Sequence, residues 1–486
     1  METIRVRKLN EANLHIQCES GTAAELREFF SFYVPGYKFM PAYKNRMWDG
    51  KIRLFNAQTG ELPAGLYFHL NEFTRNRGYL VKLEKTDYGL PDDENEIDPN
   101  KIFDWIDKLE LPFKIRDYQF DAICHGLHKR RGILISPTGS GKSLIIYCIV
   151  KYWLWQRMRR NKKALIIVPT TSLVEQMHDD FRQYGEVKEN MHRIYSGKDK
   201  KFNGIQICIS TWQSIYKLPK AWFDQFECVI GDECHGFKSK SLTSIMNKLS
   251  EASYRFGTTG TLDGTQTHEL VLQGLFGKIH RVTTTKDLQD KDTLADLNIS
   301  RIELKHSEKF DGKTYQEEID WIICHQKRNA FIRNLALSLE GNTLVLYNRV
   351  EDHGQPLYRL IKEKADENRY VFFISGQVDT MEREEIRKIV DKQKNGIIVA
   401  SLGTFSTGIN IRNLHNIIFA SPSKSQIRVL QSIGRGLRKS ENGKATELYD
   451  IIDNINGRNF AVLHGEERLK IYKKESFKVK SHKVKL

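Results

Sequence analysis

Short apolar runs alternate with longer amphipathic segments over most of the chain. The runs fall into two series, one at 133–135, 164–168, 205–209 and 228–230, the other at 343–346, 370–374, 396–400 and 416–420. Buried parallel strands joined by crossover helices have this pattern, because helices cover both faces of such a sheet. The pattern predicts an α/β fold class with two tandem parallel-sheet lobes, at residues 101–294 and 295–455.

The two ends of the chain differ from this pattern. Residues 1–90 combine a predicted helix over 22–32, capped by Ser20, with short alternating segments, which indicates a small α+β module. Residues 91–100 are rich in proline and acidic side chains, so we expect a linker that packs poorly. Residues 456–486 carry many lysines and few apolar side chains. They predict a mobile basic tail that either binds nucleic acid nonspecifically or only aids solubility.

The net charge narrows the choice of partner. The 486 residues include 76 lysines and arginines against 61 aspartates and glutamates, a formal charge of +15, which favours a polyanion and above all nucleic acid. The seven cysteines include no C-x-x-C pair, which argues against a zinc module or a disulfide framework. No apolar run approaches the roughly 18 residues that a membrane span needs, and the amino terminus lacks the apolar stretch of a secretory signal. We therefore expect a soluble intracellular protein with no membrane partner.

A glycine-rich segment carries the strongest chemical signal. An apolar strand runs into Ser136-Pro-Thr-Gly-Ser-Gly-Lys-Ser143 and then into an apolar helix, which is the context that a phosphate-binding loop requires. Backbone N–H groups of such a loop converge on phosphate oxygens, the lysine reaches the β- and γ-phosphates, and the last serine can ligate Mg²⁺. Ser136 replaces the glycine that usually begins the motif. The predicted nucleotide-binding residues are Pro137, Thr138, Gly139, Ser140, Gly141, Lys142 and Ser143, of which Lys142 is also catalytic.

An acidic pair, Asp232 and Glu233, follows another apolar strand. Open α/β sheets bind their ligands at the carboxyl ends of the strands. Nucleotide hydrolysis needs one carboxylate in the Mg²⁺ shell and a second group to orient or deprotonate water. Alone, such a pair is more often a solvated loop; downstream of a phosphate loop, we assign Asp232 to Mg²⁺ and Glu233 to the water.

These segments together resemble the motifs of the superfamily 2 helicases and translocases with a DExH box, over most of residues 111–440. Asp232-Glu-Cys-His235 resembles the box, and Gly257-Thr-Thr-Gly-Thr261 resembles the motif that couples nucleotide state to lobe movement. The resemblance implies two RecA-like lobes that use ATP and Mg²⁺. It also implies adenine recognition by Arg116 and Gln119, a nucleotide contact at Gly408, DNA contacts by Thr170, Thr211, Asn348, Arg349 and Thr404, and catalytic roles for Gln431, Arg435 and Arg438.

Within this family, Arg435 and Arg438 are the predicted arginine fingers. Side chains three residues apart on a helix lie on one face, where both can stabilise charge on a transferred phosphoryl group. A solvated basic helix face is the alternative interpretation. Because the phosphate loop belongs to the other lobe, hydrolysis is expected to require lobe closure, and such a cycle can drive stepping along a strand.

The small amino-terminal module, the motif set and the length also resemble the recombination-repair helicases of T-even bacteriophages. This implies an ATP-dependent DNA helicase acting on Holliday junctions, stalled forks, D-loops and R-loops, with branched and double-stranded DNA and RNA–DNA hybrids as partners. It further implies a monomer in the host cell cytoplasm that could work with a small phage accessory protein. The alternatives are an ATP-dependent RNA helicase, a double-stranded DNA translocase that does not unwind, and a binding module without catalysis.

The amino-terminal module interleaves aromatic and basic side chains. They are Tyr37, Lys38, Phe39, Tyr43, Lys44, Arg46, Trp48, Lys51, Arg53 and Phe55. Rings that stack on bases beside cations that contact phosphates are one use of such a pattern. The other is that the rings form the core of a small domain, and the sequence leaves both open.

Overall fold

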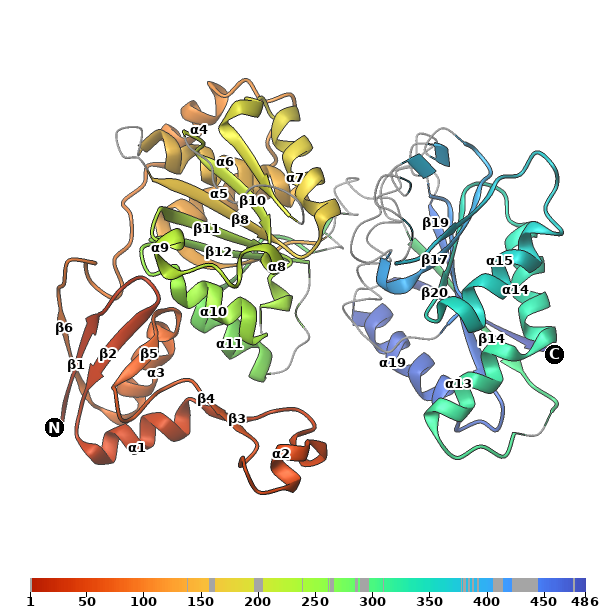
Figure 1. Ribbon diagram of the computed structural model, residues 1–486, viewed down its shortest axis with the longest axis horizontal. Helices are drawn as coiled ribbons and strands as arrows, with labels where there is room; N and C mark the ends of the chain where they lie inside the picture. Colours follow the sequence, from red (N-terminus) through yellow and green to blue (C-terminus); the bar gives the residue numbers. More distant parts are fainter. Residues whose placement is uncertain are drawn as a thin grey trace. The chain divides into compact units, whose positions relative to one another are not determined.

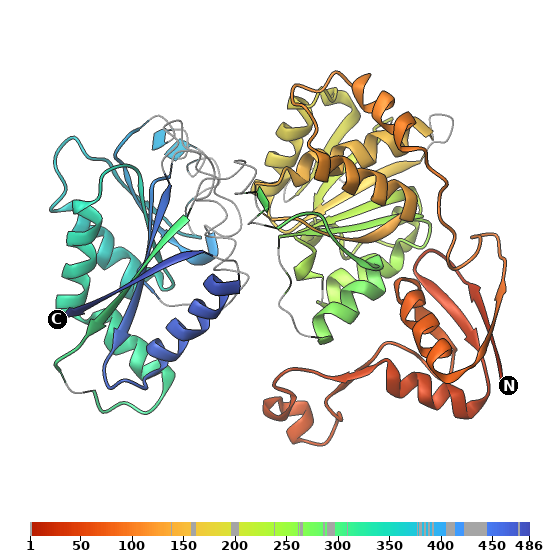
Figure 2. The same ribbon diagram turned by 180° about the vertical axis from the view of Figure 1, so that it is seen from behind.

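The computed structural model divides into two compact units, one of Met1–Ser136 and Gly141–Val282 and one of Pro137–Ser140 and Thr283–Leu486. Figures 1 and 2 show the chain from two sides. The residues that the structure describes are 2–137, 139–156, 162–195, 204–237, 239–260, 262, 266–284, 287–288, 297–308, 310–376, 378, 382, 385–386, 389–390, 393–404, 414–421, 445–474 and 477–486.

The amino-terminal module is a four-stranded mixed sheet, in the order β5-β2-β1-β6, covered by helices. Its elements are β1 (Thr3–Lys8), β2 (Asn13–Gln17), α1 (Ser20–Phe29), β5 (Glu61–Pro63), η2 (Ala64–Leu66), α3 (Tyr67–Arg77) and β6 (Leu80–Glu84). Alternate strand residues such as Ile4 and Val6 pack with Leu26 and Leu70 of the helices, because successive strand side chains point to opposite faces. The α+β architecture is therefore confirmed, although α1 begins at Ser20 itself, with Glu19 in the N-cap position.

Between α1 and β5 the chain leaves the module's sheet and forms a two-stranded ribbon with short helical turns beyond it (Figures 1 and 2). This segment contains β3 (Ser31–Tyr33), η1 (Tyr37–Phe39), α2 (Pro41–Lys44) and β4 (Lys51–Arg53), with β3 and β4 antiparallel. We call residues 31–53 the arm. Gly50 is its one buried residue, so the arm contributes no side chain to the module's core.

The segment 91–100 connects the module to the first lobe and is held by polar contacts. The backbone N–H of Asn95 donates to His128 O at 2.8 Å. The Asn95 side-chain amide donates to Leu127 O at 2.8 Å and to Tyr254 Oη at 2.5 Å. Most side chains of the segment are exposed, so hydrogen bonds such as those of Asn95 hold it in place more than apolar packing does.

The first lobe is a seven-stranded parallel sheet in the order β13-β7-β12-β11-β8-β10-β9. Its strands are β7 (Arg131–Ile135), β8 (Lys163–Val168), β9 (Met191–Ile194), β10 (Ile207–Thr211), β11 (Phe226–Asp232), β12 (Tyr254–Thr259) and β13 (Ile279–Arg281). Its longer helices are α4 (Pro99–Asp107), α5 (Asp117–Lys129), α6 (Lys142–Gln156), α7 (Thr171–Gln183), α10 (Lys240–Lys248) and α11 (Gln266–Phe276). Leu134 joins the core under α4 to α7, whereas Ile133 and Ile135 join the core under α10 and α11. Burial on both faces explains the continuous apolar runs of the sequence.

The second lobe is also a seven-stranded sheet with parallel neighbours, in the order β16-β17-β15-β18-β19-β14-β20. Its strands are β14 (Leu297–Lys305), β15 (Thr343–Tyr347), β16 (Val371–Ile374), β17 (Ile397–Ser401), β18 (Asn416–Phe419), β19 (Thr446–Asn454) and β20 (Lys478–Lys485). Described helices are α13 (Tyr315–Cys324), α14 (Gln326–Ser338), η5 (Val350–Gly354), α15 (Gln355–Lys362) and α19 (Phe460–Lys474). The predicted pair of parallel-sheet lobes is confirmed.

The prediction that residues 456–486 form a mobile basic tail is wrong. Residues 456–486 contain helix α19 and strand β20, and β20 pairs with β14 along its length, from Lys478 opposite Asn298 to Lys485 opposite Lys305. Val484 and Leu486 pack against the core of the second lobe. A strand at the edge of a sheet needs few apolar side chains and often carries lysines that discourage pairing with other chains. The lysine-rich composition therefore marks an edge strand and not a mobile tail.

All seven cysteines are free thiols, and Cys148, Cys208, Cys228 and Cys234 are buried in the first lobe. In the part of the chain that the structure describes, every helix is too short or too polar to cross a bilayer.

Candidate nucleotide and nucleic-acid site

The phosphate loop joins the end of β7 to the start of α6, as predicted. Gly139 and Gly141 have φ angles of 85° and 81°, in the left-handed region that favours glycine. Helix α6 begins at Lys142, and the Lys142 Nζ donates to Ser136 O at 3.1 Å. The ammonium is thus held beside its own loop. Thr138 lies outside the described residues.

The predicted adenine-recognising residues lie at the start of α5, next to this loop. Gln119 is buried, and its Oε1 accepts from the backbone N–H of Arg116 at 3.0 Å, which caps the helix. A Cβ added to Gly141 would stand 2.3 Å from Gln119 Nε2. Glycine at 141 therefore permits the close approach of the Gln119 amide to the loop. The Arg116 guanidinium donates to Tyr118 Oη at 2.9 Å.

The hydroxyl of Ser143, the predicted Mg²⁺ ligand, lies 2.9 Å from Tyr184 Oη. Tyr184 follows α7, and its ring lies near those of Tyr147 and Phe113, with centroids 5.5 and 6.3 Å away. The sequence analysis missed Tyr184, and no local motif marks it, since its place at the loop depends on the packing of α7 against α6.

Asp232 stands at the carboxyl end of β11 and is 7% exposed. Its Oδ1 accepts from Thr258 Oγ1 at 2.7 Å, across from the neighbouring strand β12. Burial raises the pKa of Asp232, the adjacent Glu233 carboxylate raises it further, and the Lys142 ammonium and the Thr258 hydrogen bond act in the opposite direction. Extra positive charge near Asp232 would therefore stabilise its ionised form.

Glu233 has a left-handed backbone, with φ of 51°, which is uncommon for a residue with a side chain. Strained backbone of this kind often lies at functional sites. His235 Nδ1 lies 3.4 Å from Glu233 Oε2 and 3.1 Å from Thr259 Oγ1. Each predicted acid is thus joined, directly or through His235, to the Thr258-Thr259 pair on β12.

The predicted nucleic-acid residues of the first lobe lie at the same edge of its sheet. Thr170 follows β8 and Thr211 ends β10, and these strands are parallel neighbours in register at Val168 and Thr211. The Thr170 hydroxyl accepts from Leu173 N at 3.4 Å and caps α7, and the Thr211 hydroxyl lies 2.9 Å from Ser214 Oγ. The carboxyl ends of β7, β12, β11, β8 and β10 therefore carry the phosphate loop, the threonine pair, the acids and these two threonines in that order.

The predicted residues of the second lobe that are described also follow strand ends. Asn348 and Arg349 follow β15, and Thr404 follows β17, its parallel neighbour. Asn348 is exposed, whereas Arg349 forms an ion pair with Asp320. Thr404 is buried and its Oγ1 accepts from Ser401 Oγ at 2.7 Å. The predicted residues Gly408, Gln431, Arg435 and Arg438 lie outside the described part of the chain.

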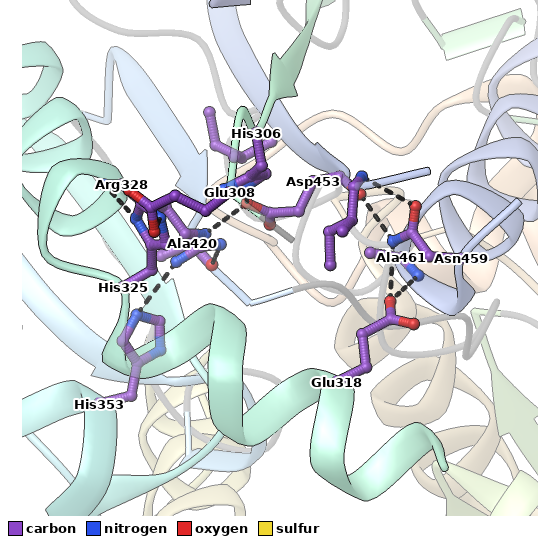
Figure 3. A network of polar contacts seen from close by, with 12 residues as sticks. His306, Glu308, Glu318, His325, Arg328, His353, Ala420, Asp453, Asn459 and Ala461 are labelled. Atoms are coloured by element: carbon purple, nitrogen blue, oxygen red, sulfur yellow. Dashed lines mark hydrogen bonds and ion pairs between the residues drawn. The ribbon is translucent and has the colours of Figure 1, made fainter. Parts of the chain in front are cut away.

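A buried polar network supports this edge of the second sheet (Figure 3). Arg328, fully buried on α14, donates through Nε to Asp453 Oδ1 at 2.8 Å and through Nη2 to Ala420 O. His306 Nε2 lies 2.9 Å from the same Asp453 oxygen. Burial and the nearby Arg328 guanidinium lower the pKa of His353 to about 3, so His353 is neutral at pH 7. One guanidinium thereby joins the ends of β18 and β19.

The donor set of the first lobe fits a magnesium-bound nucleotide. Ser143 and Asp232 supply oxygen atoms, which Mg²⁺ prefers. Among the described residues, no group of three or more His, Cys, Asp or Glu side chains is placed to hold a metal ion by itself. Few protein ligands suit Mg²⁺, which keeps several waters and usually binds together with substrate phosphates.

Three family models match successive parts of the chain. "DNA helicase UvsW, N-terminal" matches residues 3–84, "Type III restriction enzyme, res subunit" matches 112–264, and "Helicase conserved C-terminal domain" matches 326–440. They cover the amino-terminal module and parts of both lobes.

Individual proteins extend these similarities over the whole chain. The chain is 36% identical to the ATP-dependent DNA helicase uvsW of Enterobacteria phage T4, over 98% of each sequence. It is 24% identical to the DNA 3'-5' translocase XPB2 of Sulfurisphaera tokodaii, over 84% of this chain and 91% of the relative. The crystal structure of T4 UvsW matches with 35% identity and a TM-score of 0.53, over 99% of both chains.

Proposed function

Because this chain belongs to the family of the ATP-dependent DNA helicase UvsW, we propose that it uses ATP hydrolysis to unwind or branch-migrate branched DNA, namely Holliday junctions, stalled forks, D-loops and R-loops. The observation that carries this is the 36% identity over 98% of both sequences. The phosphate loop and the acidic box at one sheet edge support it, since a helicase motor needs both. The chain would act in phage recombination, repair and replication.

Within the site, we assign each step to a residue of the first lobe. Lys142 binds the β- and γ-phosphates after leaving Ser136 O, and Gln119 reads the adenine edge. Ser143 and Asp232 would hold Mg²⁺, which when bound would neutralise phosphate charge, and the Ser143 hydroxyl would then give up its contact with Tyr184. Glu233 orients and deprotonates the attacking water, and His235 keeps the Glu233 carboxylate in place.

The role of Glu233 leads to a specific prediction. Glu233→Gln keeps the size of the side chain and removes its basicity, so DNA-stimulated kcat should fall by about 10²- to 10⁴-fold. Binding of a fluorescent ATP analogue should change less than threefold. Glu227→Gln on the same strand is the control and should keep wild-type turnover. A Glu233→Gln enzyme with near-normal kcat would remove the assignment of the water-activating base.

A substrate panel tests the choice of nucleic acid. We expect ATPase activity and strand separation to be strongest on a four-way junction, a fork and an R-loop, and weaker on plain duplex and structured RNA. Preferential stimulation by RNA would favour the RNA-helicase alternative. ATPase activity without separation of a labelled fork would favour a double-stranded DNA translocase.

The remaining assignments rest on the family resemblance. Thr170, Thr211, Asn348, Arg349 and Thr404 would contact DNA, and Gly408 the nucleotide. Gln431, Arg435 and Arg438 would act in catalysis, with the two arginines as fingers. We also propose that the chain acts as a monomer in the host cytoplasm, together with a small phage accessory protein.

A further inference from the structure

The tip of the arm exposes large apolar side chains. Phe39 is 81% exposed and Met47 is 75% exposed, the two largest exposures recorded for a large hydrophobic residue in the described chain. Met40 adds a further exposed side chain. The module's own core is complete without them, since its buried cluster ends at Phe30 and resumes at Phe55. The sequence-based alternative that these rings form the core therefore holds for Phe55 and not for the arm.

The same tip carries unneutralised positive charge. The arm has five basic residues and one acidic residue, and the acid, Asp49, pairs with Arg53. Lys51 pairs with Glu28 of α1. Within the part of the chain that the structure describes, the exposed Lys38, Lys44 and Arg46 form no ion pair. Three exposed cations thus lie within a few residues of Phe39 and Met47 along the chain, and this mixture of charge and apolar surface suits a polyanion better than an apolar protein surface.

The arm is stiffened by contacts along its length. Tyr37 stacks on Tyr33 at 4.6 Å and meets Tyr43 edge-on at 4.7 Å. A Cβ added to Gly50 would stand 2.3 Å from the Tyr37 ring, so glycine allows this ring to lie against the returning strand. The Trp48 indole N–H donates to Lys51 O at 2.9 Å. Phe39 and Met47 take no part in these contacts and remain exposed.

The module that carries the arm is fixed to the first lobe. The module packs on α11 of the first lobe so closely that a Cβ on Gly65 would stand 2.0 Å from Gln273 O. His69 Nε2 lies 2.7 Å from Gln273 Oε1, and Tyr88 Oη donates to Glu251 at 3.0 Å. Module and first lobe belong to one compact unit. A group at the tip of the arm would therefore move with the first lobe during a nucleotide cycle.

We propose that the arm is a strand-separating wedge, in which Phe39 and Met47 insert at the duplex end of a DNA fork or junction while Lys38, Lys44 and Arg46 hold the flanking phosphates. The wedge rests on the proposed helicase function and adds the element that opens base pairs. Apolar side chains, including Phe and Met, unstack base steps when cations bring them to DNA. Aromatic side chains can also stack on the freed bases.

The test uses the full chain and a fork with 2-aminopurine at the junction base pair. Without nucleotide, wild-type protein should change the 2-aminopurine fluorescence on binding, and the double variant Phe39→Ala/Met47→Ala should not at saturating protein. The variant should separate the fork at least tenfold more slowly, with basal and single-strand-stimulated ATPase within twofold of wild type. Phe103→Ala, which truncates a 60% exposed phenylalanine of the first lobe, is the matched control and should behave as wild type.

The charged half of the wedge has a separate readout. Lys38→Gln/Lys44→Gln should reduce the slope of log affinity against log salt by about 2, since each phosphate contact contributes about 0.9 on duplex DNA. An unchanged slope, or unchanged 2-aminopurine signal and fork separation in Phe39→Ala/Met47→Ala, would overturn the wedge and leave the tip to a protein partner. A wild-type protein that hydrolyses ATP but never separates forks would instead overturn the proposed function, while the nucleotide-free fluorescence test would still report on the wedge.

Discussion

Lys142→Ala is expected to reduce DNA-stimulated ATP turnover by at least about 10²- to 10³-fold, since it removes the ammonium that we assign to the β- and γ-phosphates, where charge develops during phosphoryl transfer. DNA affinity without nucleotide should stay within about twofold, because the Lys142 ammonium donates to Ser136 O of its own loop and its charge acts on the neighbouring Asp232. Steady-state phosphate release and fork binding measure the two effects.

Lys151→Ala is the matched control for this variant. Lys151 lies on the same helix, and its ammonium contacts Glu186 at 2.9 Å, away from the loop. Its loss should leave turnover near wild type. Turnover retained in Lys142→Ala would contradict the nucleotide site on which the helicase assignment depends.

Arg328→Met should destabilise the second lobe by about 3–5 kcal/mol, because it removes the guanidinium that pairs with the fully buried Asp453 carboxylate. Burial opposes ionisation of Asp453, but Arg328 and the His306 hydrogen bond hold its pKa below the usual value. Without the guanidinium, Asp453 must take up a proton or admit water. Ala420 O also loses its donor.

Urea denaturation combined with hydrogen exchange measures this effect lobe by lobe. Exchange should accelerate in β18 and β19 and stay unchanged in the first lobe. Arg333→Met is the control, since the Arg333 guanidinium donates to the exposed side chain of Asn334 on the same helix, and surface changes of this kind cost about 0.5 kcal/mol or less. Equal stability of the two variants would mean that the buried pair is dispensable.

The parallel lobes could be predicted because a strand that is buried on both faces of its sheet appears in the sequence as a continuous apolar run. Ile133, Leu134 and Ile135 are all apolar since consecutive side chains enter different cores. The phosphate loop could also be predicted from the sequence, because the residues that bind phosphate are contiguous in the chain. Asp232 and Lys142 lie far apart in sequence, but both follow apolar strands. Because ligands of open α/β sheets bind at the carboxyl ends of the strands, the two residues could be predicted to lie at one edge.

Other features depend on tertiary packing that no local pattern records. Tyr184 reaches Ser143 only because α7 packs against α6. Strand β20 has the composition of a mobile tail, and only its pairing with β14 distinguishes it. The rings of the arm and of Phe55 look alike in sequence, yet Phe55 is buried and Phe39 is exposed, since exposure depends on whether a sheet lies beneath the ring.

The position of β14 has a consequence for synthesis on the ribosome. This strand comes first in the second lobe, yet both of its neighbours, β19 and β20, come from the end of the chain. During translation β14 emerges with two unpaired edges and stays unpaired until β19 and β20 have been synthesised, whereas the described strands of the first lobe all precede it. Nascent chains stalled before β19 and β20 have emerged should therefore expose an open strand that attracts chaperones or neighbouring nascent chains.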